Sequence, residues 1–381
     1  MRATFANIYL NNLKNNFYEI KKFLQPNTKI CVPVKADAYG HGATAISQAV
    51  IEYGADYLAV AAVAEGIELR KTGITIPILV LSLPQPSEFS EIIQYGLTPT
   101  VFDLELISLL EDTAEKYNEC VNVHLKIDTG MGRIGCSPDD ASKIALAISK
   151  SKWINLDGVF THFSVADSLN QEDIIYTKKQ IELFNNAIKS IKKEGINPGL
   201  CHAASSAAIF RYPEAHFDMV RPGIILYGYY PGDITEEYLK DIKTPVHLIP
   251  VMELCSSIVA IKDITPGDCI SYGRTWVAKE TGKIGVIPVG YADGLLRSFA
   301  KELKVSVKNK AYKISGRICM DQCMINLEKG LEISRWDKVI IFGPKEYGAL
   351  NDAADIAKNI NTIAYEITCG IDKRVPRLYK K

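Results

Sequence analysis

Residues 29–71 read KICVPVKADAYGHGATAISQAVIEYGADYLAVAAVAEGIELRK, and β-rich and helical patterns alternate along this stretch. Two β-rich runs, 29–35 and 57–61, are each followed by a run with helical spacing of its apolar residues, 43–53 and 64–71. Strands that alternate with helices in this way are typical of parallel sheets whose helices cover the sheet face. The stretch therefore predicts an α/β fold.

The same alternation continues to about residue 220. Six further β-rich runs lie at 77–81, 97–101, 121–127, 156–163, 200–202 and 217–220. Helical patterns lie between most of them, at 88–95, 103–117, 138–150 and 172–194. Eight strands with their connections over roughly 230 residues match the size of a (β/α)8 barrel of the TIM type. We therefore expect such a barrel in the N-terminal part.

From about residue 244 onward helical spacing becomes rare. Strand-like runs lie at 256–262, 283–289, 304–307, 323–327 and 338–342, and one helical pattern lies at 351–360. We expect a barrel domain over residues 1–240 and a mostly β C-terminal domain over residues 241–381. The opening run 3–10 also has a strand pattern, and the sequence leaves open whether it pairs with the barrel or with the second domain.

Composition and charge exclude several classes of protein. The chain has 381 residues, with 44 Lys and Arg against 44 Asp and Glu, whereas nucleic-acid-binding proteins usually carry a basic surplus. Its longest apolar stretch, 76–83, is far shorter than the roughly 20 residues of a membrane-spanning helix. Residues 1–7 lack the apolar segment of a secretory signal. Nine cysteines without a Cys-x-x-Cys pair favour reduced thiols in a cytoplasmic protein, and no metal site is expected.

Polar and apolar residues alternate along 121–128, one of the predicted barrel strands. The polar set is Asn122, His124, Lys126 and Asp128. Because the outer face of a barrel strand meets apolar helices, we expect this polar set to point toward the barrel axis. Lys35 has the corresponding phase at the end of its own strand, 29–35. Active sites of such barrels lie at the carboxyl ends of the strands, so a site is predicted there.

Lys35 has two interpretations. The ordinary one is a solvated charge at a strand end, and the other is a nucleophilic amine whose lowered pKa lets it form a Schiff base with a carbonyl. Residues 32–42, VPVKADAYGHG, favour the second, because glycines allow a ligand to approach the backbone and Tyr39 lies close by. Residues 40–45 also match the loose G-x-G-x-x-A dinucleotide pattern. They begin too far beyond the strand, which disfavours a dehydrogenase.

The run 34–42, VKADAYGHG, resembles the cofactor-lysine motif of the alanine racemases, which are fold-type III enzymes that use pyridoxal 5'-phosphate (PLP). The resemblance extends over essentially the whole chain. It continues in KIDTGMGRIG (126–135), THF (161–163), VRPGIILYG (220–228), SYG (271–273), VGYADG (289–294) and GRICMD (316–321). It implies an isomerase that interconverts L-alanine and D-alanine for peptidoglycan precursors, built from a (β/α)8 barrel and a β-rich second domain.

The resemblance assigns covalent PLP binding, and the role of one catalytic base, to Lys35. The other residues that it assigns to the cofactor are Tyr39, His162, Ser206, Arg221, Gly223 and Ile224. Arg221 would donate to the pyridine nitrogen, which would then stay unprotonated, because arginine keeps its proton near neutral pH. A weaker electron sink of this kind favours reprotonation at Cα over transamination. Taken alone, Arg221 could equally pair with a carboxylate such as Asp218.

Tyr272 resembles the second base of the family, which acts on the opposite face of Cα. A tyrosine needs help to act near neutral pH, and the resemblance assigns that help to His162, which would bridge toward Arg221. It also implies that Lys35 serves the D isomer and Tyr272 the L isomer. Tyr272 and Met320 would reach the partner's site in a head-to-tail homodimer.

Arg133 and Met320 resemble the family's contacts to the substrate carboxylate. Lys126 would bring a second positive charge close to Arg133, and the resemblance implies that this lysine is carbamylated and becomes an anion that steadies the arginine. It also implies an access corridor that admits small amino acids, formed by Asp167, Tyr291, Arg297 and Arg317.

The chain departs from the family pattern at two positions. Ser205 stands where the family usually has asparagine, and Lys373 stands where many members place a tyrosine of the inner pocket. These changes leave open a broader alanine and serine racemase. A PLP-dependent decarboxylase of the same fold type remains an alternative, although it would carry a cysteine-centred motif in place of SYG 271–273. A PLP-binding homeostasis protein would be a lone barrel.

Overall fold

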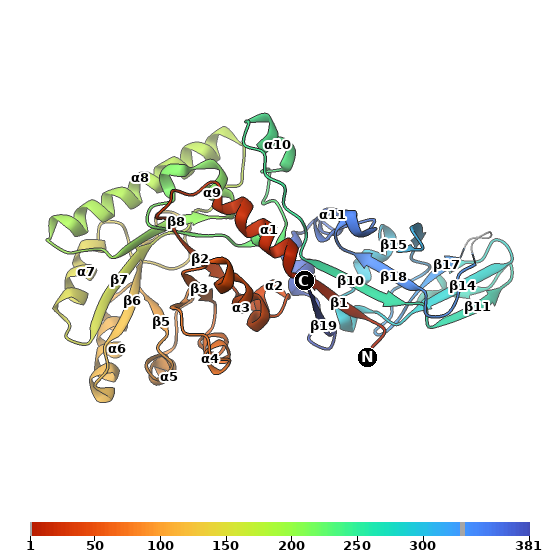
Figure 1. The fold of residues 1–381 in the computed structure, drawn as a ribbon, viewed down its shortest axis with the longest axis horizontal. Helices are drawn as coiled ribbons and strands as arrows, with labels where there is room; N and C mark the ends of the chain where they lie inside the picture. The colour runs from red at the N-terminus through yellow and green to blue at the C-terminus, as the bar shows by residue number, and fades with distance from the viewer. Residues whose placement is uncertain (1, 328–331) are drawn as a thin grey trace.

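Within residues 2–327 and 332–381, which the computed structural model describes, eight parallel strands close into a barrel (Figure 1). They are β2 (Lys29–Pro33), β3 (Tyr57–Val60), β4 (Ile78–Val80), β5 (Thr98–Val101), β6 (Val121–Lys126), β7 (Ile154–Phe160), β8 (Leu200–Ser205) and β9 (Met219–Arg221). Each strand pairs with the next, and β9 pairs back with β2. The predicted TIM-type barrel is confirmed.

Helices surround the barrel because each has an apolar face. They are α1 (Leu10–Lys21), α3 (Ala43–Tyr53), α4 (Val63–Lys71), α5 (Phe89–Gln94), α6 (Leu104–Tyr117), α7 (Ala141–Lys150), α8 (Gln171–Lys193) and α9 (Ser206–Arg211). In α6 the buried residues Leu106, Leu110 and Ala114 follow helical spacing. The side chain of Asp103 caps α6 by accepting the backbone N–H of Leu106 (2.8 Å).

The interior of the barrel has an apolar part and a polar part. The apolar cluster consists of Cys31, Tyr57, Ala59, Leu79 and Met219. His124 and Lys126 of β6 are buried, and His124 reaches His202 of β8 across the interior, so these two polar side chains point inward as predicted. Asn122, at the start of β6, is exposed.

The second part of the chain forms a mixed sheet in the order β16-β15-β18-β10-β1-β19. Its strands are β1 (Phe5–Tyr9), β10 (Met252–Ser257), β15 (Lys304–Val307), β16 (Lys310–Lys313), β18 (Lys338–Phe342) and β19 (Arg377–Lys380). The first strand, β1, lies between β10 and β19, so the two ends of the chain meet in this sheet. We propose a domain boundary near residue 240, with β1 counted among the strands of the C-terminal domain.

A smaller antiparallel sheet extends this domain. It contains β11 (Ala260–Ile264), β14 (Gly282–Ile287) and β17 (Cys323–Leu327), and β12 (Cys269–Ile270) pairs with β13 (Trp276–Val277) nearby. The single strand expected at 256–262 is wrong. The chain turns between β10 and β11 at Ile258, whose backbone bonds to Trp336 and Asp337 instead of to a continuous ladder. The helices of this domain are α11 (Ala353–Asn359) and α12 (Ala364–Cys369), whereas α10 (Glu236–Asp241) lies on the barrel side (Figure 1).

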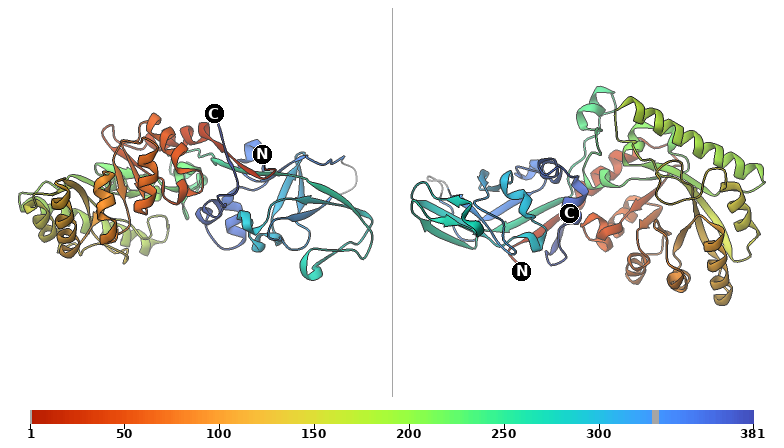
Figure 2. Two further views of the ribbon diagram at one scale, coloured as in Figure 1. Left: turned by 90° about the horizontal axis from the view of Figure 1, so that it is seen from below. Right: turned by 180° about the vertical axis from the view of Figure 1, so that it is seen from behind.

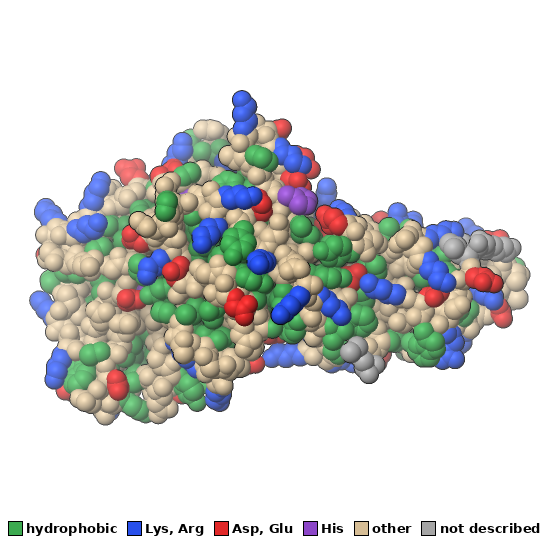
Figure 3. All heavy atoms as spheres, in the orientation of Figure 1, with side chains coloured by type: hydrophobic (Ala, Val, Ile, Leu, Met, Phe, Trp, Pro, Cys, Tyr) green, Lys and Arg blue, Asp and Glu red, His purple; other side chains and the backbone are tan. Residues whose placement is uncertain are grey.

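The molecule is elongated, with the barrel at one end and the β-rich domain at the other (Figures 1 and 2). Both termini lie near the middle, where β1 and β19 lead back toward the barrel. Figure 3 shows basic and acidic side chains intermingled over both parts of one face. In the described part of the chain we find no helix with the length and apolar character needed to cross a membrane.

Candidate active site

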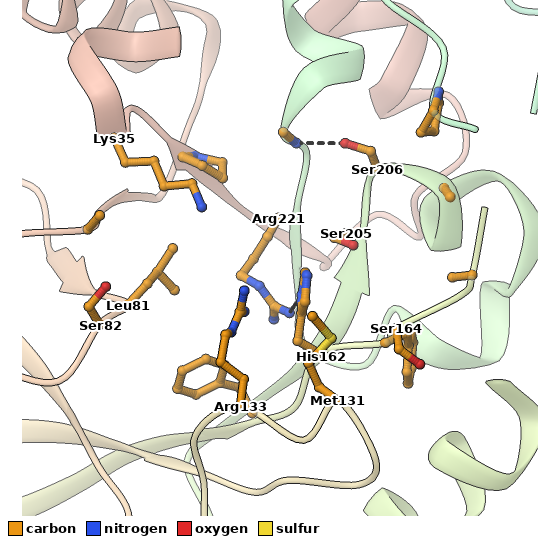
Figure 4. Close-up of a pocket in the computed structure, with 18 of the residues that line it drawn as sticks. Lys35, Leu81, Ser82, Met131, Arg133, His162, Ser164, Ser205, Ser206 and Arg221 are labelled. Atoms are coloured by element: carbon orange, nitrogen blue, oxygen red, sulfur yellow. Dashed lines mark hydrogen bonds between the residues drawn. The ribbon is translucent and has the colours of Figure 1, made fainter. Parts of the chain in front are cut away.

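A cavity of about 450 Å³ opens at the carboxyl ends of the barrel strands (Figure 4). Ten of the residues singled out from the sequence line it: Lys35, Tyr39, Lys126, Arg133, His162, Asp167, Ser205, Ser206, Arg221 and Gly223. They come from five different strands or the loops that follow them. Figure 4 shows the side chains of Lys35, Arg133 and Arg221 pointing toward the centre of this cavity.

Lys35 lies at the start of an unusual backbone turn. Strand β2 ends at Pro33, so the expectation that Lys35 ends its strand is wrong by two residues. The next four residues, 36–39, all have φ between 51° and 54°, which is the left-handed region. For residues other than glycine this conformation costs about 1–2 kcal/mol each. The turn, α2 (Lys35–Tyr39), therefore stores strain directly beside the lysine.

Contacts from three parts of the chain hold this strained turn. Glu65 accepts the backbone N–H of Ala36 through Oε1 (2.7 Å). Asp37 accepts the backbone N–H of Ala43 (2.7 Å), which ties the turn to α3. Arg377 of β19 donates from Nε to the carbonyl of Gly40 (3.0 Å). The end of the chain thus helps to fix the backbone that carries Lys35.

The surroundings of Lys35 suit a nucleophilic amine. Burial lowers the pKa of Lys35, and the positive charge of Arg133 lowers it further, while Glu65 acts in the opposite direction. A lower pKa increases the fraction of neutral amine, which is the form that attacks a carbonyl. This environment favours the second of the two interpretations drawn from the sequence.

A small cradle lies beside Lys35. The backbone N–H of Gly223 donates to Oγ of Ser206 (3.0 Å). A Cβ on Gly223 would lie 3.2 Å from the hydroxyl of Tyr39 and 3.3 Å from Oγ of Ser206, so only glycine leaves this space free. Burial raises the pKa of Tyr39, which keeps its phenol a neutral donor. Hydroxyl and amide donors around an open space fit the phosphate group of PLP.

Arg221 is buried at the inner wall of the cavity and is firmly held. Nη2 donates to the carbonyls of Thr161 (2.7 Å) and Ala203 (2.8 Å), and Nη1 donates to Nδ1 of His202 (2.6 Å). Burial lowers the pKa of Arg221 to about 10, so the guanidinium stays charged at neutral pH. Asp218 accepts the backbone N–H of Cys201 (2.8 Å) and is not among the described partners of Arg221.

His162 and Lys126 lie next to Arg221. Nη2 of Arg221 and Nδ1 of His162 are 3.5 Å apart, which agrees with the expected bridge between them. Burial and the charge of Arg221 hold the pKa of His162 well below its usual value, so the imidazole is neutral. Burial, Arg221 and Arg133 likewise hold the pKa of Lys126 well below its usual value. Nζ of Lys126 lies 4.4 Å from the ring centroid of Phe160.

The loop that follows β6 brings Arg133 to the cavity. Asp128 organises this loop, because its Oδ1 accepts the backbone N–H groups of Gly130 (3.0 Å), Met131 (2.8 Å) and Gly132 (3.1 Å). Burial alone would raise the pKa of Asp128, but these three donors hold it below its usual value. The carboxylate therefore stays charged and keeps the loop closed.

Other predicted site residues lie away from this cavity in the described chain. Tyr272 begins a short 3₁₀ turn, η4 (Tyr272–Arg274), in the second domain and is 69% exposed, and Met320 is 53% exposed. Ile224 is fully buried next to Gly223. Lys373 is exposed and does not line the cavity of its own chain. Tyr291, Arg297 and Arg317 also belong to the second domain and do not line the cavity of their own chain.

Backbone contacts hold Tyr291 and Met320 together in the second domain. The N–H of Tyr291 donates to the carbonyl of Cys319 (3.1 Å), and the N–H of Ala292 donates to the carbonyl of Met320 (3.0 Å). Arg374 then joins the two segments, because Nε contacts Asp293 and Nη2 contacts Asp321, each at 2.7 Å. The VGYADG and GRICMD motifs therefore form one surface.

Two aromatic residues of the cavity were missed by sequence reasoning. Tyr365 of α12 lines the cavity together with Ser206. Phe160 ends β7, and its ring stacks on His202 with centroids 4.8 Å apart. Phe160 could have been found from the alternation of its strand. Tyr365 lies in a short helix that the sequence pattern does not predict.

In comparisons with known proteins, both parts of the chain match models of one family. The family model described as "Alanine racemase, N-terminal domain" matches residues 8–231, and "Alanine racemase, C-terminal domain" matches residues 251–379. The alanine racemase of Treponema denticola is 51% identical over 381 residues, which is all of this chain and 98% of that protein. The alanine racemase of Treponema pallidum is 42% identical and is covered completely.

Solved structures agree with these matches. The alanine racemase of Clostridium difficile 630 superposes with a TM-score of 0.92 at 40% identity, and the match covers 100% of this chain and 96% of that one. The alanine racemase of Bacillus anthracis, solved with bound L-Ala-P, has a TM-score of 0.91 at 33% identity, with the same coverage.

Proposed function

The chain belongs to the alanine racemase family, and we propose that it interconverts L-alanine and D-alanine with Lys35 and Tyr272 as two opposed bases. It is an isomerase, and its family role is to supply D-alanine for cell-wall precursors. The observation that carries the assignment of the site is the meeting of Lys35, with its lowered pKa, the Gly223 cradle and the buried Arg221 in one cavity.

The cavity has the donors that PLP needs. We infer that Lys35 holds the cofactor covalently and that Tyr39, Ser206 and Gly223 hold its phosphate. The side chain of Ile224 does not line the cavity, so this residue would contribute through its backbone N–H, next to Gly223. When bound there, PLP draws electron density away from Cα of the attached amino acid and makes the Cα proton removable. Arg221 would donate to the ring nitrogen of bound PLP and, because it remains charged, would leave that nitrogen unprotonated.

The cradle gives a direct test of cofactor binding. Gly223→Ala is expected to weaken PLP binding about tenfold or more, because crowding a packed site costs about 1–3 kcal/mol. Titration of the apoprotein with PLP, followed by visible absorbance, measures the change. Gly282→Ala is the matched control, since a Cβ there would meet no atom closer than 3.8 Å. Equal PLP affinity in the two variants would contradict the phosphate assignment.

Two groups move the proton at Cα. We propose that Lys35 removes or returns it on one face of the substrate and serves D-alanine, while Tyr272 does the same on the other face and serves L-alanine. His162 is neutral, lines the cavity and lies 3.5 Å from Nη2 of Arg221, so it can support the tyrosine.

Tyr272 requires a second copy of the chain. Its strong exposure, and that of Met320, supports a head-to-tail homodimer in which both residues reach the cavity of the partner. The surface that Arg374 joins carries Tyr291 with Met320, and we propose that Arg297 and Arg317 complete the access corridor there together with Asp167.

Arg133 is proposed to bind the substrate carboxylate, because its planar guanidinium matches two carboxylate oxygens. The nearby Lys126 is proposed to be carbamylated. Its lowered pKa supplies the neutral amine that this reaction needs. The nitrogen attacks carbon dioxide, a proton leaves, and the resulting carbamate anion offsets the charges of Arg133 and Arg221.

Carbamylation is open to direct observation. Protein equilibrated with ¹³C-bicarbonate is expected to show a carbamate carbonyl signal by NMR, and Lys126→Met is expected to lose that signal together with part of its activity. Lys116→Met, at an exposed lysine of α6, is the matched control and should keep wild-type activity and the carbamate signal. A wild-type protein with no carbamate signal would refute the modification.

The activity itself is tested with both isomers. Purified holoenzyme incubated with L-alanine or with D-alanine is expected to reach equal amounts of the two, because mirror images have equal free energies in water. A parallel incubation with L-serine measures the breadth that Ser205 leaves open. Failure to convert alanine would refute the proposal, and release of carbon dioxide would point to the decarboxylase alternative.

A cytoplasmic location is part of the same proposal. All nine cysteines lie in the described part of the chain and are free thiols, which suits a reducing compartment.

A further inference from the structure

A chain of hydrogen bonds runs from Arg221 through the barrel interior, away from the cavity. Nη1 of Arg221 contacts Nδ1 of His202 (2.6 Å), and Nε2 of His202 contacts Nδ1 of His124 (2.9 Å). Nε2 of His124 then contacts Oδ2 of Asp157 (3.3 Å), and the hydroxyl of Tyr57 donates to the same oxygen (2.9 Å). The chain thus connects the cofactor site with the amino-terminal side of the barrel.

Chemistry fixes the direction of every bond in this chain. A guanidinium can only donate, so Nδ1 of His202 must accept and its Nε2 must carry the proton. That proton is donated to Nδ1 of His124, which leaves the proton of His124 on Nε2, facing the Asp157 carboxylate. Both imidazoles therefore have one defined tautomer, which is required by the donor-only guanidinium at one end and by the acceptor-only carboxylate at the other.

The backbone is adapted to build this chain. Along β6 and β7, Val123 pairs with Leu156 but His124 pairs with Gly158, so Asp157 is the extra residue of a β-bulge. A bulge re-aims a side chain, and here the Asp157 carboxylate meets His124. A Cβ on Gly158 would lie only 2.8 Å from Cε1 of His124, so glycine makes room for the imidazole.

The side chains in this series of hydrogen bonds have the charge states that the bond directions require. Burial lowers the pKa of His124, and burial and Arg221 hold the pKa of His202 well below its usual value, so both rings are neutral. The hydrogen bond from His124 lowers the pKa of Asp157, which keeps it ionised. Phe160 stacks on the His202 ring at an interplanar angle of 1° and limits its rotation.

We propose that Asp157, with Tyr57, is a positioning residue for Arg221 and acts on it through His124 and His202. The anion at the far end orients both imidazoles so that His202 presents a lone pair to the guanidinium. Arg221 then keeps the alignment with which it faces the cofactor ring, and to this extent the inference rests on the proposed function. Asp157 itself does not line the cavity in the described chain, so its effect is indirect.

The test compares two carboxylates of the barrel, Asp157 within β7 and Asp218 directly before β9. Asp157→Asn keeps the shape of the side chain but removes the charge. Asp218→Asn is the matched control, because Asp218 accepts a backbone N–H and takes no part in the series of hydrogen bonds from Arg221 to Asp157. Asp157→Asn is expected to lower kcat for alanine about tenfold, the scale of losing a hydrogen bond that involves a charged group, with little change in KM. Tyr57→Phe, a milder change, should lower kcat less.

A spectroscopic readout separates positioning from packing. In holoenzyme with ¹⁵N-labelled histidine, wild type and Asp218→Asn are expected to show the Nε2–H tautomer at His124 and His202, and Asp157→Asn should alter both sets of signals. The inference is overturned if Asp157→Asn keeps wild-type kcat, or if kcat falls while both tautomers stay unchanged. Neither outcome touches the proposed function, which fails only if the wild-type enzyme does not racemise alanine.

Discussion

Lys35→Ala is expected to abolish racemisation in both directions, with a loss of about 10⁴-fold or more, because one side chain supplies both the covalent tie to PLP and a base. The lysine amine lies in the cavity with a lowered pKa, held by a turn that three other segments anchor. Initial rates from L-alanine and D-alanine measure the loss. Borohydride reduction followed by mass spectrometry should find PLP on the wild type and none on the variant.

The control for this variant is another lysine. Lys116→Ala removes an exposed lysine of α6 that is absent from the cavity lining and is expected to keep full activity and covalent PLP. If Lys35→Ala kept wild-type turnover, the assignment of the site would be wrong.

Tyr272→Phe is expected to retain the visible absorbance of bound PLP and to lose turnover by about 10²–10⁴-fold, the usual contribution of a general acid or base. The change removes one hydroxyl from a side chain that is exposed in the single chain. It should therefore leave the fold and the melting temperature unaltered. Tyr347→Phe, at another partly exposed tyrosine of the second domain, is the control and should stay close to wild-type activity.

Mixing the two inactive chains tests whether Tyr272 serves the partner. A dimer with one Lys35→Ala chain and one Tyr272→Phe chain has one site with both changes and one site with neither. Co-expression should therefore restore about one quarter of wild-type activity, since half of randomly formed dimers are mixed. No recovery in isolated mixed dimers would mean that each tyrosine acts in its own chain.

The barrel could be predicted because its strands obey simple rules. Each parallel strand is buried on both faces, so it has a short apolar run followed by a helix with its own periodicity. The strands of the second domain were harder to predict from the sequence. Its short strands β12, β13, β16 and β19 have no clear alternation, and β19 pairs with β1 from the other end of the chain, a contact that no local pattern encodes.

The sequence predicts a site residue where the chemistry of the side chain and its inward-facing position in the strand alternation agree. His124 and Lys126 follow the alternation of β6 and point inward. Asp157 was missed because the bulge in β7 breaks that alternation, so a period-two argument fails there. The left-handed turn after Lys35 was missed because three of its four residues, Ala36, Ala38 and Tyr39, are of types that seldom adopt positive φ. Tertiary contacts from Glu65 and Arg377 stabilise it, and they cannot be seen in a local stretch.

Early-time isotope incorporation is the most direct measurement of a racemase with two opposed bases. Holoenzyme is given L-alanine in deuterium oxide, and both isomers are recovered after a small fraction has reacted. We predict deuterium at Cα of nearly all D-alanine formed, while the remaining L-alanine stays protiated, because one group removes the proton and a different, solvent-exchanged group returns a deuteron. D-alanine that largely keeps the original proton would show that a single base carries it across, and would contradict the assignment of Lys35 and Tyr272 to opposite faces.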